Sequence, residues 1–205
     1  MGKTICIGLF AKREPNLFIW ANAFEERKEI IFLSSNEDNW MIRDIMEIRT
    51  ATIADLAQIA AVEAECFPAA EAATKEEFAE RIKYYGNYFW LMFEGEKLIA
   101  FVDGFVTDKP DLTDEMYERA EMHDENGAWQ MIFGVNTIPA YRKHGYAGQL
   151  LQCAIEDARK QGRKGLVLTC KEKLIAYYAK FGFENEGISE SVHGNVTWYQ
   201  MRYEF

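Results

Sequence analysis

The chain has 205 residues, of which 49% are hydrophobic, and its 33 acidic and 23 basic residues give a formal net charge of −10. This hydrophobic content is enough for a folded α/β domain and excludes a disordered tail. The negative charge would repel a nucleic-acid backbone, so nucleic acid is not an expected partner, whereas cationic amines would be attracted. An acidic surface also serves solubility alone, and composition does not separate these two roles.

Metal binding and membrane insertion are not expected either. The four cysteines and three histidines are scattered, without the close spacings of a metal site, so the cysteines are interpreted as reduced core residues. The first residues lack the pattern of a signal peptide. No stretch approaches the ~18 apolar residues of a membrane span. The expected compartment is the cytoplasm.

The chain is predicted to divide near residue 45. Residues 1–45 form an N-terminal extension, either packed on the following domain or upstream of the start that the cell uses; within it, 28–35 favours a strand. The second unit, 46–205, opens with a short strand at Ile48. A helix capped by Thr52 follows, in which several apolar residues and Glu63 keep helical spacing.

The middle of the chain combines a helix, a hairpin and an acidic stretch. The helix is predicted from Thr74, and the apolar runs 88–93 and 97–106 are joined by Glu94-Gly95-Glu96, which is typical of a β-hairpin. Residues 108–126 hold eight acidic and two basic residues and favour a short helix around 112–122. This stretch is either a solvated face or the wall of a site for a cation.

The last third of the chain is mixed α and β. Residues 129–137 predict a strand in which Gly134 marks a bulge or a close backbone approach. Apolar residues from Tyr146 to Ala158 follow helical spacing, and Gly162 ends that helix. Three further elements are predicted: a buried strand over 165–170, a helix over 172–180 and a strand over 194–203. The whole order indicates an α/β fold around one sheet.

The loop IPAYRKHGYAG (138–148) concentrates positive charge between a strand and a helix. Helix N-termini expose free N–H groups that bind phosphates, Arg142 and Lys143 add charge, and Gly145 and Gly148 would let the backbone approach a ligand. An ordinary turn with solubilising cations fits the same residues. Neither a P-loop nor a dinucleotide-binding glycine pattern occurs here.

Arg142, Gly145 and Ala147 form an R-x-x-G-x-A pattern that resembles the acetyl-CoA-binding motif of the GNAT superfamily of N-acetyltransferases. Three further segments resemble the arylalkylamine (serotonin) N-acetyltransferases of that superfamily and their bacterial relatives: 66–82, 108–120 and 168–187. The resemblance covers about residues 46–205 in order. It implies a GNAT fold, which is a central twisted mixed β-sheet, splayed at its middle strand and flanked by helices.

By this resemblance the cosubstrate is acetyl-CoA, and no metal takes part. The pantetheine arm would pair with backbone near Val135 and Thr137, and the pyrophosphate would lie over the 142–148 loop. The implied cofactor-binding residues are Val135, Asn136, Thr137, Arg142, Lys143, His144, Gly145, Tyr146, Ala147 and Gly148.

The implied reaction is direct attack of a primary amine on the acetyl thioester, which requires an acid for the departing thiolate. Tyr178 matches the family's tyrosine before a Phe-Gly-Phe and is the expected general acid, because a phenol with a pKa of ~10 lies near a thiol at ~8.5. Helical periodicity alone would place this tyrosine in the core. The expected acceptor-binding residues are Phe67, Met131 and Phe133.

The departure from the family pattern lies on the central strand. Vertebrate members carry two histidines there, and Met131 and Phe133 stand at the matching positions. The general base is therefore open among His123, an acidic residue of 108–126 and ordered water.

The expected acceptor is a small primary amine, arylalkylamines among them, and the protein would be a monomer or a homodimer. Alternative acceptors are a polyamine, an aminoglycoside or a protein N-terminus, all of them cationic. A protein of another class, a regulator that binds acyl-CoA without turnover, also fits the loop.

Overall fold

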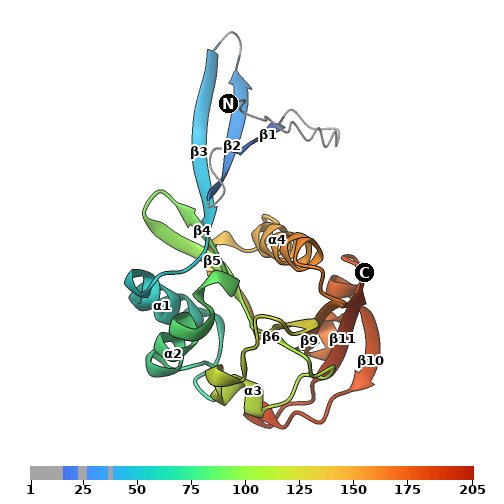
Figure 1. Cartoon of the computed structure of the whole chain (residues 1–205). Coiled ribbons are helices and arrows are strands. Elements are labelled where there is room, and N and C mark those ends of the chain that lie inside the picture. Colours follow the sequence, from blue (N-terminus) through green and yellow to red (C-terminus); the bar gives the residue numbers. More distant parts are fainter. Residues whose placement is uncertain (1–15, 23–26, 37–38) are drawn as a thin grey trace.

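The computed structural model describes residues 16–22, 27–36 and 39–205 (Figure 1). Its strands are β1 (Asn16–Asn22), β2 (Arg27–Asn36), β3 (Asn39–Arg49), β4 (Phe89–Glu94), β5 (Lys97–Asp103), β6 (Val106–Thr107), β7 (Trp129–Ile132), β8 (Gly134–Thr137), β9 (Gly165–Cys170), β10 (Glu184–Ile188) and β11 (Tyr199–Glu204). The α-helices are α1 (Leu56–Cys66), α2 (Lys75–Tyr85), α3 (Glu115–Glu118), α4 (Tyr146–Lys160) and α5 (Ile175–Ala179). The predicted mixed α/β class is confirmed.

The strands form two sheets rather than one. The first has the order β1-β2-β3-β4-β5-β8 and the second has the order β10-β11-β9-β7-β6. All the strand pairs are antiparallel except β7 with β9, which is parallel. Because β7 and β8 are successive pieces of one chain segment, that segment leaves one sheet and enters the other.

The sheets separate at Phe133. β7 pairs with β9 as far as Ile132, opposite Leu168, and β8 pairs with β5 from Gly134 onward. A Cβ built on Gly134 would lie 2.6 Å from Oδ1 of Asp103, so this position requires a glycine for a close approach, as the sequence predicts. The predicted splay at the middle strand is therefore present.

Helix caps follow the sequence signals. Thr74 and Glu77 form a capping box at the start of α2. Thr52 and Asp55 form another ahead of α1, where Arg49 donates two hydrogen bonds to the Asp55 carboxylate. These contacts fix the two helices that cover one face of the first sheet.

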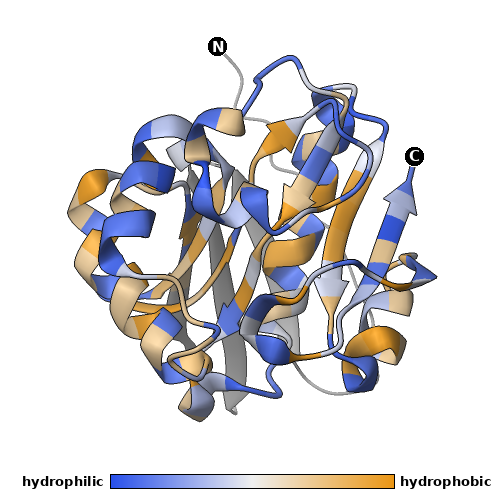
Figure 2. Ribbon diagram, turned by 90° about the horizontal axis from the view of Figure 1, so that it is seen from below, coloured by the Kyte–Doolittle hydropathy of each residue, from blue (hydrophilic) through white to orange (hydrophobic). Residues whose placement is uncertain are grey.

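The apolar core lies between the sheets and their helices. In Figure 2 hydrophobic segments follow the strands in the middle of the molecule, and the outer helices alternate hydrophobic and hydrophilic segments. Phe78 of α2 makes edge contacts with Phe89 and Phe101, at centroid distances of 6.2 and 5.8 Å. α4 packs on β4, β5, β8 and β9 and so lies against both sheets.

The predicted boundary at residues 45 and 46 falls inside one strand. β3 pairs with β2 along its length and with β4 from Met46 to Arg49, and β1 to β3 extend away from the body of the molecule (Figure 1). The strand predicted over 28–35 lies within β2, and the role of the extension over 1–45 stays a prediction. Cys6 lies outside the described residues.

Two elements differ from the sequence expectation. β10 was not predicted, because its mostly exposed residues lack a hydrophobic alternation. The helix expected around 112–122 is instead α3 and a short 3₁₀ turn over 120–122. None of the described helices is long and apolar enough to cross a membrane.

Candidate functional site

A cavity of about 810 Å³ opens where β8 and β9 diverge. β8 pairs with β5 along one edge, and no other described strand covers its second edge. The walls come from α1, α2, the 108–126 stretch, the start of α4, α5 and the segment between β10 and β11. The splay of the sheet therefore creates a recess large enough for a small molecule.

The part of the cavity wall at the N-terminus of α4 is basic. Arg142 and Lys143 line it, and the Arg142 Nε donates a hydrogen bond to the carbonyl of Thr137 at 3.0 Å. Lys143 and Gly145 have φ of 69° and 84°, in the left-handed region. A Cβ on Gly145 would meet nothing within 4 Å, so this backbone conformation, not space, favours glycine there.

Seven of the ten predicted cofactor residues line the cavity and three do not. Those that line it are Val135, Thr137, Arg142, Lys143, Gly145, Tyr146 and Ala147. Asn136 is completely buried. His144 stacks on Tyr146 at a centroid distance of 5.6 Å, with Nδ1 2.9 Å from the Arg142 carbonyl.

Gly148 serves a packing role in the structure. A Cβ there would lie 2.8 Å from Cζ of Phe181, so glycine makes room for this ring. The sequence pattern predicts that this glycine lets the backbone approach a ligand, but Gly148 is not among the residues that line the cavity.

Tyr178 lies on α5 and lines the cavity, although only 6% of its surface is exposed. Its ring packs edge-on against Tyr177 and Phe183, at centroid distances of 5.2 and 6.1 Å. Burial raises the pKa of Tyr178 far above its ordinary range. The pKa of Tyr178 is therefore not close to that of a thiol, contrary to the sequence-based expectation. This phenol is better suited to donating a hydrogen bond than to losing its proton completely.

Two of the three predicted acceptor residues line the cavity. Phe67 and Phe133 are in its wall, whereas Met131 is completely buried in the core. Two ring-bearing cavity residues were among those that sequence reasoning missed: Tyr117, whose ring lies 4.8 Å from that of Phe133, and His193, which stacks on Tyr117 at 5.6 Å. They come from segments with no catalytic spacing, so no local pattern identifies them.

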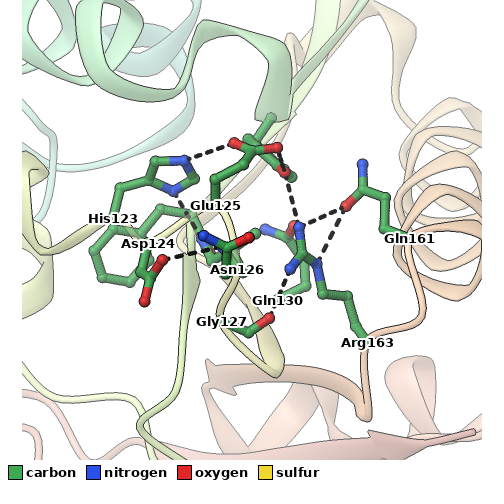
Figure 3. A network of polar contacts seen from close by, with 11 residues as sticks. His123, Asp124, Glu125, Asn126, Gly127, Gln130, Gln161 and Arg163 are labelled. Carbon is green, nitrogen blue, oxygen red and sulfur yellow. Dashed lines mark hydrogen bonds and ion pairs between the residues drawn. The ribbon is translucent and has the colours of Figure 1, made fainter.

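His123 lies outside the cavity lining and holds the 108–126 stretch in place (Figure 3). Its Nδ1 accepts a hydrogen bond from the Val106 N–H at 3.2 Å, and its Nε2 is 3.1 Å from Glu125. Its ring contacts those of Tyr85 and Tyr88 at 5.7 and 5.2 Å. Both ring nitrogens are thus engaged in structural contacts.

The acidic stretch nevertheless contributes to the cavity wall. Asp114, Tyr117 and Glu118 line it. Asp114 accepts hydrogen bonds from the Ser191 hydroxyl and from the Val192 N–H, the latter at 2.9 Å. Of the two interpretations of 108–126, the structure therefore supports a wall of a site over a purely solvated face.

A buried charged cluster also lines the cavity. Arg81 of α2 donates a hydrogen bond to Asp103 of β5 at 3.2 Å and another to the Tyr117 carbonyl at 3.0 Å. Glu63 of α1 accepts a hydrogen bond from the Ala73 N–H at 3.1 Å. All three charged side chains line the cavity and are at most 6% exposed.

The two carboxylates of this cluster have raised pKa values. Burial, and then the charge of Asp103, raises the pKa of Glu63 to about 7. Burial likewise raises the pKa of Asp103 to about 6, although Arg81 acts in the opposite direction. One sequence signal could have identified Glu63. It lies four residues after the buried Ile59, so this acidic residue is on the apolar face of α1. Within the described residues no group of three or more potential metal-binding side chains occurs.

Comparisons with known proteins show which family the chain belongs to. Serotonin N-acetyltransferase of Mesocricetus auratus is 27% identical over 111 residues, which cover 54% of this chain and 52% of that protein. The chain thus matches about half the length of this curated relative.

Two solved structures share the fold. The GphF GNAT-like decarboxylase in complex with isobutyryl-CoA has a TM-score of 0.67 and 21% identity, covering 77% of this chain and 98% of the other. Naa50 of Arabidopsis thaliana, in complex with a bisubstrate analogue, has a TM-score of 0.61 and 18% identity, covering 78% and 99%. A model of the acetyltransferase (GNAT) family matches residues 56–183, which run from the start of α1 past the splayed strands to the end of the Phe-Gly-Phe. The chain belongs to the acetyltransferase (GNAT) family.

Proposed function

We propose that this protein transfers the acetyl group of acetyl-CoA to the primary amine of a small molecule. The observation that carries this proposal is a single cavity lined by two chemically different groups of side chains. Arg142 and Lys143 lie at the N-terminus of α4, and Glu63 and Asp103 belong to a buried carboxylate cluster. A polyanionic cosubstrate suits the basic group and a cationic amine suits the acidic one.

The residues present fit acetyl-CoA. The uncovered edge of β8 can hydrogen-bond to the amide groups of an extended pantetheine arm, as a strand edge does to an added strand. Val135 and Thr137 of this strand line the cavity. The volume of about 810 Å³ lies within the range of small-molecule sites. When bound, acetyl-CoA supplies the activated acetyl group.

The chemistry requires a neutral amine and a stabilised leaving sulfur. The amine nitrogen forms a bond to the acetyl carbon, and the carbon–sulfur bond breaks. Tyr178 would donate a hydrogen bond to the sulfur as that bond breaks, and its raised pKa means that the proton moves only once negative charge develops there. Of the two protons that an ammonium loses overall, one ends on the thiol and the other leaves through a base.

The acceptor we favour is an arylalkylamine. An aromatic wall, formed by Phe67, Tyr117 and Phe133, lines the same cavity as the buried charged cluster. This combination suits a cation attached to an aromatic ring. The similarity to a serotonin N-acetyltransferase supports this choice. A protein N-terminus, a polyamine and an aminoglycoside are the competing acceptors. A cytoplasmic location and a monomeric or homodimeric state stay predictions.

The experiment is acetyl-CoA-dependent thiol release across a panel of amines: phenethylamine, tryptamine, spermidine, an aminoglycoside and a short peptide with a free N-terminus. We expect the highest kcat/KM for an arylalkylamine. A higher value for another amine would retain the reaction and replace the acceptor. Binding of acetyl-CoA without release by any amine would favour a regulator, and absence of acetyl-CoA binding would contradict the proposal entirely.

A further inference from the structure

We propose that Glu63 binds the acceptor's ammonium group and accepts its proton, the role for which the sequence identifies no residue. This inference rests on the proposed acetyl transfer. It assigns a proton-accepting site to the recess between α1 and β8, and it is argued from the charges, contacts and position of the cavity side chains.

The buried cluster has an unbalanced negative charge. It contains two carboxylates, Glu63 and Asp103, and one guanidinium, Arg81, which cannot deprotonate in a protein. Arg81 is 3.2 Å from Asp103. Glu63 accepts a hydrogen bond from the neutral Ala73 N–H, and its Oε2 is buried without a partner within hydrogen-bond distance among the described residues. Besides Arg81, the side chain that favours its charge is the neutral amide of Asn136. Such a carboxylate is unfavourable unless a proton or a cation joins it, and an incoming ammonium provides either.

The other acidic residues of the cavity already have partners or face solvent. The Glu71 carboxylate binds Lys171 with both oxygens at 2.8 Å. Glu77 caps α2 through the N–H and hydroxyl of Thr74, and Asp114 binds Ser191 and Val192. Glu118 is exposed. Among the cavity carboxylates, Glu63 is therefore the buried one that lacks a charged or capping partner.

The position of Glu63 is suitable for the reaction. α1 packs against β8, the strand proposed to hold the pantetheine arm. Cys66, one turn further along α1, lies next to the Thr137 backbone and Arg142, and Glu63 lies beside Asn136. Glu63 and Tyr178 line the same cavity, so the proton acceptor and the sulfur-side hydroxyl share one space.

The surroundings of Glu63 make it a base of suitable strength. The groups that face it are Asp103 of β5, Arg81 of α2, Asn136 of β8 and the Ala73 N–H. Burial and Asp103 outweigh the others and raise the pKa of Glu63 to about 7. A base with this pKa is substantially ionised at neutral pH and is a stronger proton acceptor than an ordinary carboxylate.

The proton balance closes with these groups. One proton passes from the ammonium to the Glu63 carboxylate, and the neutral amine then forms the nitrogen–carbon bond while the carbon–sulfur bond breaks. The second nitrogen proton replaces the one that Tyr178 gives to the sulfur. The products are the amide and the free thiol, and Glu63 returns its proton to solvent.

The test compares Glu63→Gln with Glu65→Gln, which makes the same change two residues along α1, where the side chain is exposed and outside the cavity. We expect Glu63→Gln to lower kcat/KM for the amine at pH 7 by about 10²- to 10⁴-fold, the usual effect of losing a general base. Affinity for acetyl-CoA should change less than about twofold, and Glu65→Gln should behave as the wild type in both measurements.

The pH profile separates proton transfer from a structural effect. In the wild type, kcat/KM should rise with pH and level off near 7, whereas in Glu63→Gln it should keep rising towards the pKa of the free amine. In Glu63→Asp, kcat/KM should still level off near pH 7, but at a lower value than in the wild type. This variant also provides the test if the glutamine variant folds poorly. A Glu63→Gln enzyme with the wild-type rate and profile would overturn the assignment alone. Absence of amine-dependent release by the wild type would instead overturn the proposed function and this assignment with it.

Discussion

At the scale of single residues, burial and not residue type determines the chemistry of this site. Glu63 and Glu65 belong to the same helix, but Glu63 faces the cavity cluster and Glu65 faces solvent. Only Glu63 has a buried neighbour, Asp103, that disfavours its charge. Tyr178 is buried as well and remains a neutral hydroxyl at neutral pH. Burial therefore brings the pKa of Glu63 into the neutral range and keeps Tyr178 protonated.

Replacing the Tyr178 hydroxyl tests its proposed role. We expect Tyr178→Phe to lower kcat by about 10²-fold or more, because the departing sulfur loses a hydrogen-bond donor, while affinity for acetyl-CoA changes little. Stopped-flow thiol release and titration calorimetry would measure the two quantities. Tyr199→Phe is the matched control, since Tyr199 lies on β11 outside the cavity lining. Unchanged turnover in Tyr178→Phe would exclude the sulfur-side role.

At the scale of elements, the N-terminus of α4 combines two kinds of glycine. Gly145 allows the left-handed turn that precedes the helix, and Gly148 makes room for the Phe181 ring from the α5 side. The first shapes the loop around its proposed ligand, and the second packs the helix against its neighbour. One short sequence pattern thus contains a loop requirement and a packing requirement.

The charge of this loop is tested by Lys143→Gln. We expect about a tenfold loss of affinity for acetyl-CoA, because a charge-assisted contact to phosphate contributes about 1.5 kcal/mol or more. Affinity for S-acetyl-pantetheine, which lacks the pyrophosphate, should not change. Lys160→Gln is the control, because Lys160 is exposed at the opposite end of α4. Equal losses for both ligands would place Lys143 away from the phosphates.

At the scale of the whole molecule, the splayed sheet unites segments that are far apart in the chain. Glu63, Asp103, Thr137 and Tyr178 line one cavity although they come from four different elements. The arrangement depends on the change of strand pairing at Phe133: β7 pairs with β9 before this residue, and β8 pairs with β5 after it. The buried carboxylates that result from it also affect the stability of the entire fold.

That effect predicts a pH-dependent difference in the free energy of unfolding. The pKa of Glu63 is raised from 4.5 to about 7, so the folded state binds its proton more tightly than the unfolded state. The resulting stabilisation is fully present below about 4.5 and is lost as the pH rises through 7. From pH 5 to pH 8, the free energy of unfolding of Glu63→Gln should therefore increase relative to that of the wild type by on the order of 1 to 3 kcal/mol.

Urea unfolding of the ligand-free proteins at several pH values would measure this difference. Asp103 is present in both proteins, so its own titration largely cancels in the comparison. Glu65→Gln should show a constant difference from the wild type over the same range, because its side chain is exposed. A constant difference for Glu63→Gln would contradict the raised pKa.

Much of the fold and part of the site could be predicted from local patterns. The hairpin at Gly95, the helix start at Thr74 and the long helix from Tyr146 are each determined by neighbouring residues, so the sequence identifies them. The basic loop was recognised for the same reason. Most of its residues do line the cavity. The packing requirement at Gly148 could not be predicted locally, because Phe181 lies 33 residues away in the chain.

The sequence by itself determined the α/β class, the basic loop before α4 and the family resemblance, because charge, periodicity and turn residues act over a few positions. It left the base open and placed Met131 in the acceptor pocket, although this side chain is buried in the core. Only the tertiary structure revealed the cluster of Glu63, Arg81 and Asp103. Their pKa values depend on desolvation and on charges brought together by folding, and neither quantity exists in an extended chain.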